Sequence, residues 1–264
     1  MNIVFWNVER LGQSTPDDAK TLIADVVEWF FDDKDVELVV LCEITSGTTA
    51  TASTGGELIV EKVGQVKKRR KRLESAQLGY SVISKNSDSP QASVINVPNY
   101  EDVFKLPNYK KAGQVFKDFS KRGVLELQTL CDNTDVYFYH VNSSLRSSYL
   151  VGWVSEFLRQ RTSEHGYPFV LIGDMNCSPN DVKIELMYYD DSKLKGAGWS
   201  DKFEVHASGA THHARKGATK VLDFAVGNKG KAVTLSSIDT LHFSKFPGTY
   251  TDHPDHFPIM LKVA

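Results

Sequence analysis

Residues Phe169 to Pro179, with the sequence FVLIGDMNCSP, form the stretch around which the chain can be organised. Four leading apolar residues predict a buried strand, and Gly173 ends it where the backbone turns or passes close to a ligand. Asp174 and Asn176 are two residues apart, so in an extended segment they point to the same side. A carboxylate and an amide together suit a divalent cation and its phosphate ligand. The same residues before Ser-Pro are also common turn formers, and this stretch alone leaves both interpretations open.

The first 43 residues predict a strand, a helix and a second strand. Residues 2–8 read as a strand that ends in polar residues, with Asn7 at its exit. Residues 15–18, TPDD, form a helix start with a capping residue, a proline and two acids in order. An apolar run at 36–42 then ends at Glu43. Polar side chains therefore follow both predicted strands.

The rest of the chain predicts further strands and two more helices. The strands are expected at residues 80–85, 92–97, 122–127, 136–141, 221–226, 232–240 and 257–263. The first two of these are expected to belong to a second, antiparallel series. Apolar residues from Leu150 to Leu158 predict a helix, and Asn180 is expected to cap a short one. Because no repeat or linker separates the elements, we expect one α/β domain over residues 1–264.

Composition indicates an ordinary globular chain without a global charge signal. The chain has 31 basic and 33 acidic residues, so its net charge of −2 indicates neither a nucleic-acid nor a membrane partner. No run of 18 apolar residues predicts a membrane span. The sequence starts without a secretory leader, which predicts a cytoplasmic location, with a mature secreted form as the alternative. Cys42, Cys131 and Cys177 are expected to be reduced and structural rather than zinc ligands.

One basic cluster lies at residues 67–72, with the sequence KKRRKR. Between Glu61 and Glu74 there are seven basic and two acidic residues, a local charge of +5, so the remainder carries −7. A solvated helix face and a contact with a nucleic-acid backbone explain the cluster about equally well. The candidate phosphate contacts within it are Lys68, Arg69 and Arg70. No aromatic residue interrupts the run, so base stacking is not indicated.

Six polar segments at predicted strand exits resemble those of the endonuclease/exonuclease/phosphatase superfamily. They are FWNV at 5–8, LCE at 41–43, YHVN at 139–142, GDMNCSP at 173–179, LDF at 222–224 and DHFPI at 255–259. The resemblance spans nearly the whole chain. It implies a four-layer α/β sandwich, in which two mixed β-sheets pack face to face between helices, with the site at one end. It also implies a phosphoester hydrolase that uses Mg²⁺, for which Mn²⁺ substitutes.

The resemblance implies a role for each matching residue. The implied metal ligands are Glu43, Asn7, Asp255 and the auxiliary Glu9. Asp174 and Asn176 would position the attacking water and the phosphate oxygens. His256, oriented by Asp223, would be the general base or proton relay. His140 would stabilise the phosphate or protonate the leaving oxygen, and the implied phosphate contacts are Arg122, Asn142 and, with a poorer match, Tyr80.

Each of these residues also has an ordinary structural explanation. His140 alone would fit a core histidine, and Glu43 would fit a surface cap or ion pair. Asp223 follows two apolar residues, where an unpaired buried carboxylate is costly, which favours a histidine partner.

The terminal Asp-His pair can be placed at two positions. The superfamily usually has Ser or Thr before the pair, which resembles Thr251 before Asp252-His253. It also has one residue, a proline and an aliphatic residue after the pair, which resembles the sequence after Asp255-His256. We choose Asp255 and His256, because this histidine comes directly before the last predicted strand. His212 and His213 lie in a segment with glycine and lysine and are expected to be exposed.

The superfamily predicts the bond that is cleaved better than the substrate. The basic run, the lysine-rich segment 105–121 and Arg122 favour a DNA endonuclease. The protein is expected to be a monomer. The alternatives are a phosphatase of phosphoinositides or other phosphoesters, a sphingomyelinase-like phosphodiesterase, and a non-catalytic binding module. No apolar loop suited to a bilayer is found, which argues against a lipid substrate.

Overall fold

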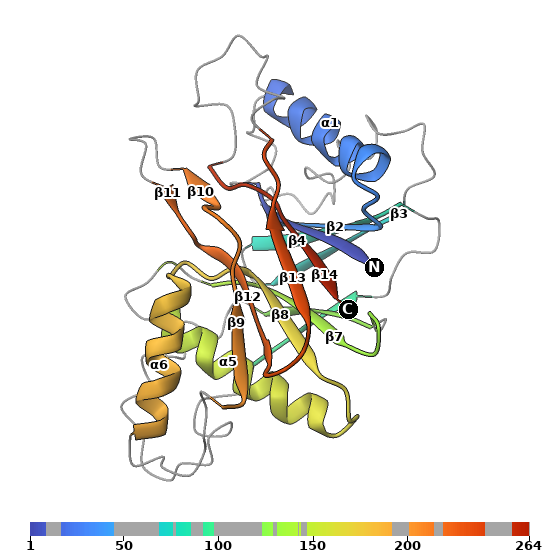
Figure 1. Ribbon diagram of the computed structural model, residues 1–264. Coiled ribbons are helices and arrows are strands. Elements are labelled where there is room, and N and C mark those ends of the chain that lie inside the picture. The colour runs from blue at the N-terminus through green and yellow to red at the C-terminus, as the bar shows by residue number, and fades with distance from the viewer. Residues whose placement is uncertain are drawn as a thin grey trace.

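The protein is described by a computed structural model in which two mixed sheets lie between helices (Figure 1). The residues described are 1–8, 17–44, 69–75, 78–85, 92–97, 123–128, 131–141, 143, 147–191, 201–213, 219–240 and 255–263. Among the helices of these segments, none has both the length and the apolar composition needed to cross a membrane.

The first sheet has six strands in the order β13-β14-β1-β2-β4-β3. Their bounds are β1 Asn2–Asn7, β2 Leu38–Ile44, β3 Arg69–Ser75, β4 Leu78–Ser84, β13 Val233–Ser237 and β14 Ile259–Val263. β1 and β2 are parallel, and helix α1 (Asp17–Asp33) lies between them in the chain. β4 pairs antiparallel with β2. The assignment of this strand to a separate second series was therefore wrong, because its backbone partners lie in the first sheet.

The second sheet has six strands in the order β5-β6-β7-β8-β12-β9. Their bounds are β5 Ala92–Ile95, β6 Val124–Leu127, β7 Asp135–His140, β8 Phe169–Asp174, β9 Phe203–His206 and β12 Asp223–Asn228. β7 and β8 are parallel, with helix α5 (Ser147–Ser163) between them. All six residues of β8 are buried, which explains its continuous apolar run.

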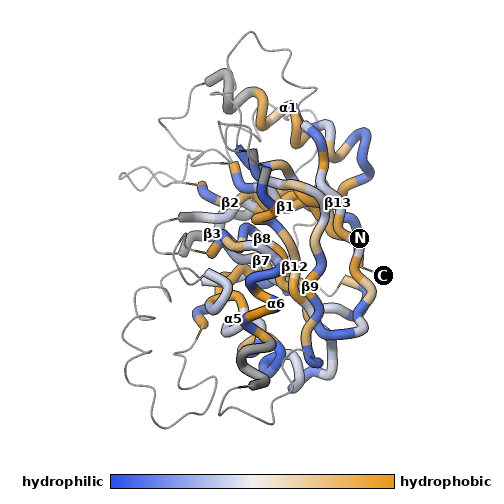
Figure 2. Tube along the Cα trace, turned by 60° about the vertical axis from the view of Figure 1, so that its left-hand side comes forward, coloured by the Kyte–Doolittle hydropathy of each residue, from blue (hydrophilic) through white to orange (hydrophobic). Residues whose placement is uncertain are grey.

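Three apolar layers hold the sandwich together. Between the two sheets, Phe5 stacks on Phe138 with ring centroids 6.2 Å apart. Outside the first sheet, Trp6 meets Phe30 of α1 edge to face. Outside the second sheet, the core includes side chains of α5 and α6 (Pro179–Asp191). Figure 2 shows α1 on one side and α5 and α6 on the other, with many strand residues between them hydrophobic. The four-layer sandwich predicted from the resemblance is therefore confirmed.

Several local predictions change with the structure. A short ribbon of β10 (His212–His213) and β11 (Thr219–Lys220), together with β9, was not predicted. Helix α6 is capped by Ser178 and not by Asn180, since the Asp181 amide donates to the Ser178 hydroxyl at 3.1 Å. The described part of the basic run lies in strand β3 and not in a helix.

None of the three cysteines, all of which lie in the described segments, forms a disulfide, as predicted. Cys42 and Cys131 are buried, and burial raises the pKa of the Cys131 thiol to about 11.

Candidate active site

The register of the second sheet brings three of the predicted residues into one row. His140 at the end of β7 pairs with Asp174 at the end of β8, and Asp174 pairs with Asp223 at the start of β12. Directly paired residues of neighbouring strands lie on the same face of a sheet. The first sheet adds Asn7 from the end of β1 and Glu43 near the end of β2. Chain segments far apart in sequence therefore meet at one end of the sandwich.

The Asp174 carboxylate lies at the centre of this group and is 1% exposed. The side-chain amide of Asn7 donates to its Oδ2 at 2.8 Å, and the backbone N–H of Asn176 donates to its Oδ1 at 3.0 Å. Burial and the negative charge of Asp223 raise its pKa. Asn176 has a left-handed backbone, with φ of 49°, and its amide donates to the Val141 carbonyl at 2.7 Å. The interpretation of residues 174–176 as a turn and their interpretation as part of a site are thus compatible, since Asn176 forms the turn that presents Asp174.

His256 is held between carboxylates. Its Nδ1 lies 2.7 Å from Asp223 Oδ2, and its Nε2 lies 3.7 Å from Asp174 Oδ2. The indole N–H of Trp6 donates to the His256 carbonyl at 2.8 Å, which ties this segment to β1. Burial lowers the pKa of His256, but the carboxylates of Asp223, Asp174 and Asp255 outweigh burial and raise it to about 10. Asp223 therefore orients the imidazole, and the surrounding carboxylates favour its protonated form.

His140 lies on the other side of Asp174. Its Nε2 is 3.2 Å from Glu43 Oε1 and 3.6 Å from Asp174 Oδ2. Its backbone N–H donates to the Tyr80 hydroxyl at 3.0 Å, and that hydroxyl donates to the Gly123 carbonyl at 3.3 Å. Tyr80 is buried, so the structure does not support the predicted phosphate contact. Instead, Tyr80 holds the backbone of His140 in place.

Glu43 has a strained backbone with φ of 61°, at an irregularity in the pairing of β2 with β4 between Leu41 and Ile44. A left-handed conformation is unfavourable for an ordinary side chain and tends to be kept at functional sites. The irregularity turns the Glu43 side chain to a place where it is 17% exposed and contacts His140. The conformation indicates that the direction of this carboxylate matters.

Comparison with solved structures identifies the fold. The chain is similar to an endonuclease/exonuclease/phosphatase family protein from Leptotrichia buccalis, with a TM-score of 0.61 and 13% identity over 100% of this chain and 99% of that chain. This chain has the endonuclease/exonuclease/phosphatase fold. It is also similar to truncated Caenorhabditis elegans TDP2, with a TM-score of 0.59 and 14% identity over 98% and 95% of the two chains. CdtB, the biologically active subunit of cytolethal distending toxin, gives a TM-score of 0.56 and 13% identity over 100% and 97%. No family model and no curated protein matches the sequence.

The predicted metal ligands of this endonuclease/exonuclease/phosphatase fold lie in two places. The side-chain amide of Asn7 hydrogen-bonds to Asp174, and the carboxylates of Glu43 and Asp174 both lie near Nε2 of His140. Oxygen ligands suited to Mg²⁺ therefore gather around Asp174. The donor chemistry of these residues therefore fits Mg²⁺. Asp255 instead contacts His212 and His256.

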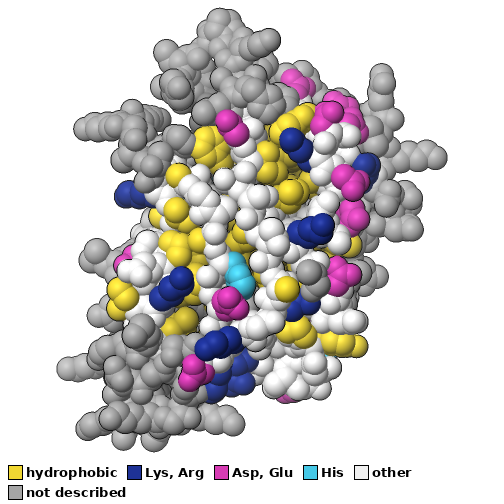
Figure 3. All heavy atoms as spheres, viewed as in Figure 1, with side chains coloured by type: hydrophobic (Ala, Val, Ile, Leu, Met, Phe, Trp, Pro, Cys, Tyr) yellow, Lys and Arg dark blue, Asp and Glu magenta, His cyan; other side chains and the backbone are white. Residues whose placement is uncertain are grey.

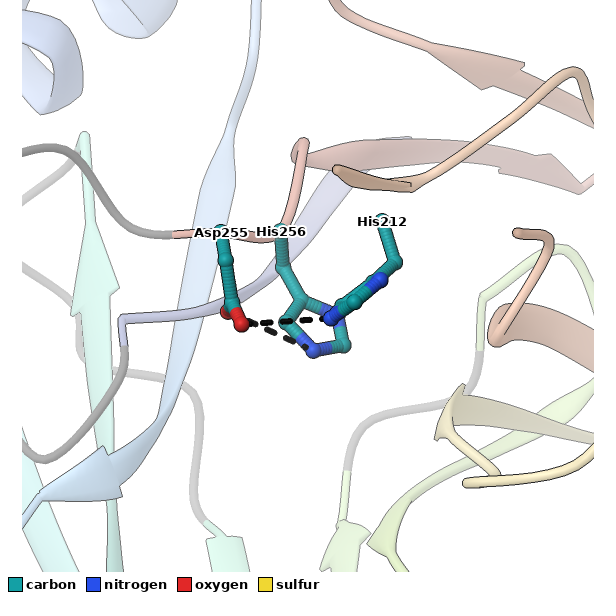
Figure 4. A group of neighbouring side chains, drawn as sticks. All are labelled: His212, Asp255 and His256. Atoms are coloured by element: carbon teal, nitrogen blue, oxygen red, sulfur yellow. Dashed lines mark hydrogen bonds and ion pairs between the residues drawn. The ribbon is translucent and has the colours of Figure 1, made fainter. Parts of the chain in front are cut away.

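His212 is the residue of this site that sequence reasoning missed. Its Nε2 lies 3.1 Å from Asp255 Oδ2, and its ring centroid lies 4.9 Å from that of His256 (Figure 4). The expectation of an exposed loop was wrong for this residue, whose side chain is 17% exposed. Its strand spans two residues and thus shows no alternation, so only the adjacent histidines hinted at it.

Several predicted residues cannot be placed at the site. Glu9, Lys68, Arg122, Asn142 and the pair Asp252-His253 lie outside the described residues, and for Arg69 and Arg70 the structure describes the backbone of β3 alone.

Proposed function

We propose that this protein is a Mg²⁺-dependent endonuclease that hydrolyses phosphodiester bonds in DNA. The observation that carries the proposal is the continuous group Asp223, His256, Asp174, His140 and Glu43 at the end of the sandwich. Phosphodiester hydrolysis needs a positioned water, charge stabilisation on the phosphate oxygens and proton transfer at both ends. Two oriented histidines and three carboxylates supply groups for each of these tasks.

Asp174 and His256 act on the attacking water in this mechanism. The amides that bind Asp174 fix its carboxylate, so that it orients a water by accepting a hydrogen bond. Asp223 binds Nδ1 and fixes the His256 ring, so that Nε2, which lies 3.7 Å from Asp174 Oδ2, accepts a proton from the water that Asp174 orients. Glu43 and Asn7 would hold Mg²⁺, which would neutralise negative charge on the phosphate oxygens.

His140 acts on the phosphate or the leaving oxygen. Its Nε2 faces Glu43 and Asp174, and the Tyr80 hydroxyl fixes its backbone. A histidine in this setting can donate a hydrogen bond to a phosphate oxygen or a proton to the leaving oxygen. Nε2 of His140 and Nε2 of His256 lie 3.6 Å and 3.7 Å from the same oxygen, Asp174 Oδ2, so both histidines adjoin the carboxylate that orients the water.

The choice of DNA as substrate rests on the basic run. On the face seen in Figure 3, basic and acidic side chains are interspersed, with no broad patch of one sign among the described residues. The +5 charge between Glu61 and Glu74 is therefore the strongest local attraction for a phosphate backbone that the sequence offers.

The test is nicking of supercoiled plasmid in Mg²⁺ or Mn²⁺. We expect wild type to nick the plasmid and His256→Ala to lose at least about a hundredfold in rate, the usual contribution of a positioned proton donor or acceptor. Glu43→Ala should also lose activity, because it removes a proposed ligand of the metal ion. The control is His165→Ala, which replaces an exposed histidine in the turn that follows α5. Release of phosphate from inositol phosphates with DNA left intact would replace the nuclease with a phosphatase. Inertness toward both substrates would favour a binding module.

A further inference from the structure

The cluster of His212, Asp255 and His256 has a composition that the Mg²⁺ site lacks. Two of its three ligand atoms are imidazole nitrogens, His212 Nε2 and His256 Nε2, and the third is a carboxylate oxygen of Asp255 (Figure 4). Mg²⁺ prefers oxygen ligands, whereas imidazole suits Zn²⁺ and similar transition-metal ions. A nitrogen-rich cluster next to an oxygen-rich one therefore calls for a different ion.

The spacing of the three side chains fits a tetrahedral ion. Asp255 Oδ2 lies 3.1 Å from His212 Nε2, Asp255 Oδ1 lies 3.7 Å from His256 Nε2, and one ligand atom from each residue lies within 4.8 Å of the others. Tetrahedral bonds of about 2.0–2.1 Å separate ligand atoms by roughly 3.4 Å. Small rotations of the side chains would thus bring all three onto one ion.

The backbone and the surrounding side chains hold the cluster in place. His212 and His256 face each other in a β-bridge, and the Phe257 amide donates to the Thr211 carbonyl at 2.7 Å. Asp223 binds Nδ1 of His256 and is the carboxylate partner that metal-binding histidines commonly have. Nε2 then lies 3.7 Å from a carboxylate oxygen of Asp255 and 3.7 Å from one of Asp174. Asp255 is 37% exposed, so an ion can enter from solvent and a position remains open for water.

We propose that His212, Asp255 and His256 form a binding site for a transition-metal ion of the Zn²⁺ class, and that occupancy of this site inhibits the hydrolytic reaction. The inhibitory part of the proposal rests on the proposed function, because an ion bound to His256 Nε2 blocks the nitrogen that takes part in proton transfer. The binding part stands independently, since it depends on the three ligands alone.

Binding is tested by titrating Zn²⁺ into metal-free wild-type protein in a calorimeter, with Co²⁺ as a spectroscopic substitute. We expect one tight Zn²⁺ site and the strong visible absorption of four-coordinate Co²⁺. His212→Gln and Asp255→Asn should each weaken Zn²⁺ binding by at least about tenfold, the lower limit for loss of even an outer-shell partner. His165→Gln removes an exposed histidine elsewhere and should bind as wild type does.

Some outcomes would overturn the proposal. Wild type that binds no Zn²⁺ at 100-fold excess, or that gives only the weak spectrum of six-coordinate Co²⁺, would refute the site without reference to any variant. Unchanged Zn²⁺ affinity in His212→Gln, with circular dichroism like that of wild type, would refute the ligand assignment.

The inhibitory part has a separate readout. Adding Zn²⁺ to the Mg²⁺ nicking reaction should inhibit wild type at concentrations at least tenfold lower than those needed for His212→Gln. Equal inhibition of the two proteins would refute it. Absence of nicking in every condition would refute the proposed endonuclease and leave the Zn²⁺ binding result intact.

Discussion

Gly173 carries the closest approach between two strands at the site. A Cβ atom at this position would lie 1.7 Å from the carbonyl oxygen of Tyr139 and 2.8 Å from its carbonyl carbon. Because these atoms belong to the backbone of β7, they cannot move aside as a flexible side chain would. The close approach expected from the sequence is therefore to the neighbouring strand, and it sets the spacing of His140 and Asp174, the next residues along each strand.

Gly173→Ala should separate β7 from β8. We expect the free energy of unfolding to fall by about 1–3 kcal/mol or more, as overpacking does in a well-packed core. Gly209→Ala is the matched control, because its nearest contact would be the Ser237 hydroxyl at an ordinary 3.7 Å, and it should change stability by no more than about 0.5 kcal/mol. Urea unfolding measures both. Equal stabilities of the two variants would contradict this account of Gly173.

His256 should make the stability of the metal-free protein depend on pH. Its folded pKa of about 10 lies above its ordinary value of 6.5, so its stabilising contribution is complete below pH 6.5 and is lost as pH rises through 10. The Asp223 carboxylate raises this pKa more than any other neighbouring charge does, so Asp223→Asn should flatten the decline. Urea unfolding at several pH values between 6.5 and 10, in the presence of a chelator, measures the slope. Parallel curves for wild type and variant would rule out this coupling.

At the scale of elements, helix α6 depends on the turn that leaves the site. The Ser178 hydroxyl accepts a hydrogen bond from the Asp181 amide at 3.1 Å, and the Asp181 carboxylate accepts one from the Ser178 amide at 3.2 Å. This reciprocal pair satisfies two backbone donors at the helix start. Asn180 lies inside the first turn and is exposed, so it has no capping role.

Removal of the cap should therefore destabilise the protein, whereas removal of the neighbouring amide should not. We expect Ser178→Ala to lower the free energy of unfolding by about 0.5–2 kcal/mol. Asn180→Ala should stay within about 0.5 kcal/mol of wild type. Thermal and urea unfolding compare them directly. A larger loss in Asn180→Ala would restore the cap predicted from the sequence.

At the scale of the whole molecule, the site exists only because both sheets contribute to it. Asn7 and Glu43 come from the first sheet, and His140, Asp174 and Asp223 come from the second. The apolar layer between the sheets holds these groups in register. The described part of the basic run lies in β3, which is the edge strand of the first sheet next to β4.

Neutral residues in place of Lys67–Arg72 should weaken DNA binding and flatten its dependence on salt. Each lost phosphate contact should reduce the slope of log K against log salt by about 0.9. The measurement is fluorescence anisotropy with labelled duplex DNA, in a chelator and on a His256→Ala background to prevent cleavage. A partial control for lost positive charge replaces the exposed Lys183 and Lys262, which lie outside the basic run, by alanine. An unchanged slope would make the basic run irrelevant to DNA.

Much of the site was predictable from the sequence, because its residues follow apolar runs that announce buried strands. Asn7, Glu43, His140, Asp174 and Asp223 all stand at or next to a strand end, where the structure brings them together. This signal is local. The periodicity of the chain gives the strand ends, and the resemblance to the superfamily implies the roles of the residues there.

Tertiary structure alone decided the placement of β4 in the first sheet, the burial of Tyr80 and the approach of His212 to Asp255. Each depends on a partner 30 or more positions away, and a two-residue strand or a single buried hydroxyl leaves no periodic trace in the sequence. The sequence by itself determined which apolar runs form buried strands and which polar residues stand at their ends. Packing between distant segments determined which of those residues touch, because contact is a property of the folded chain.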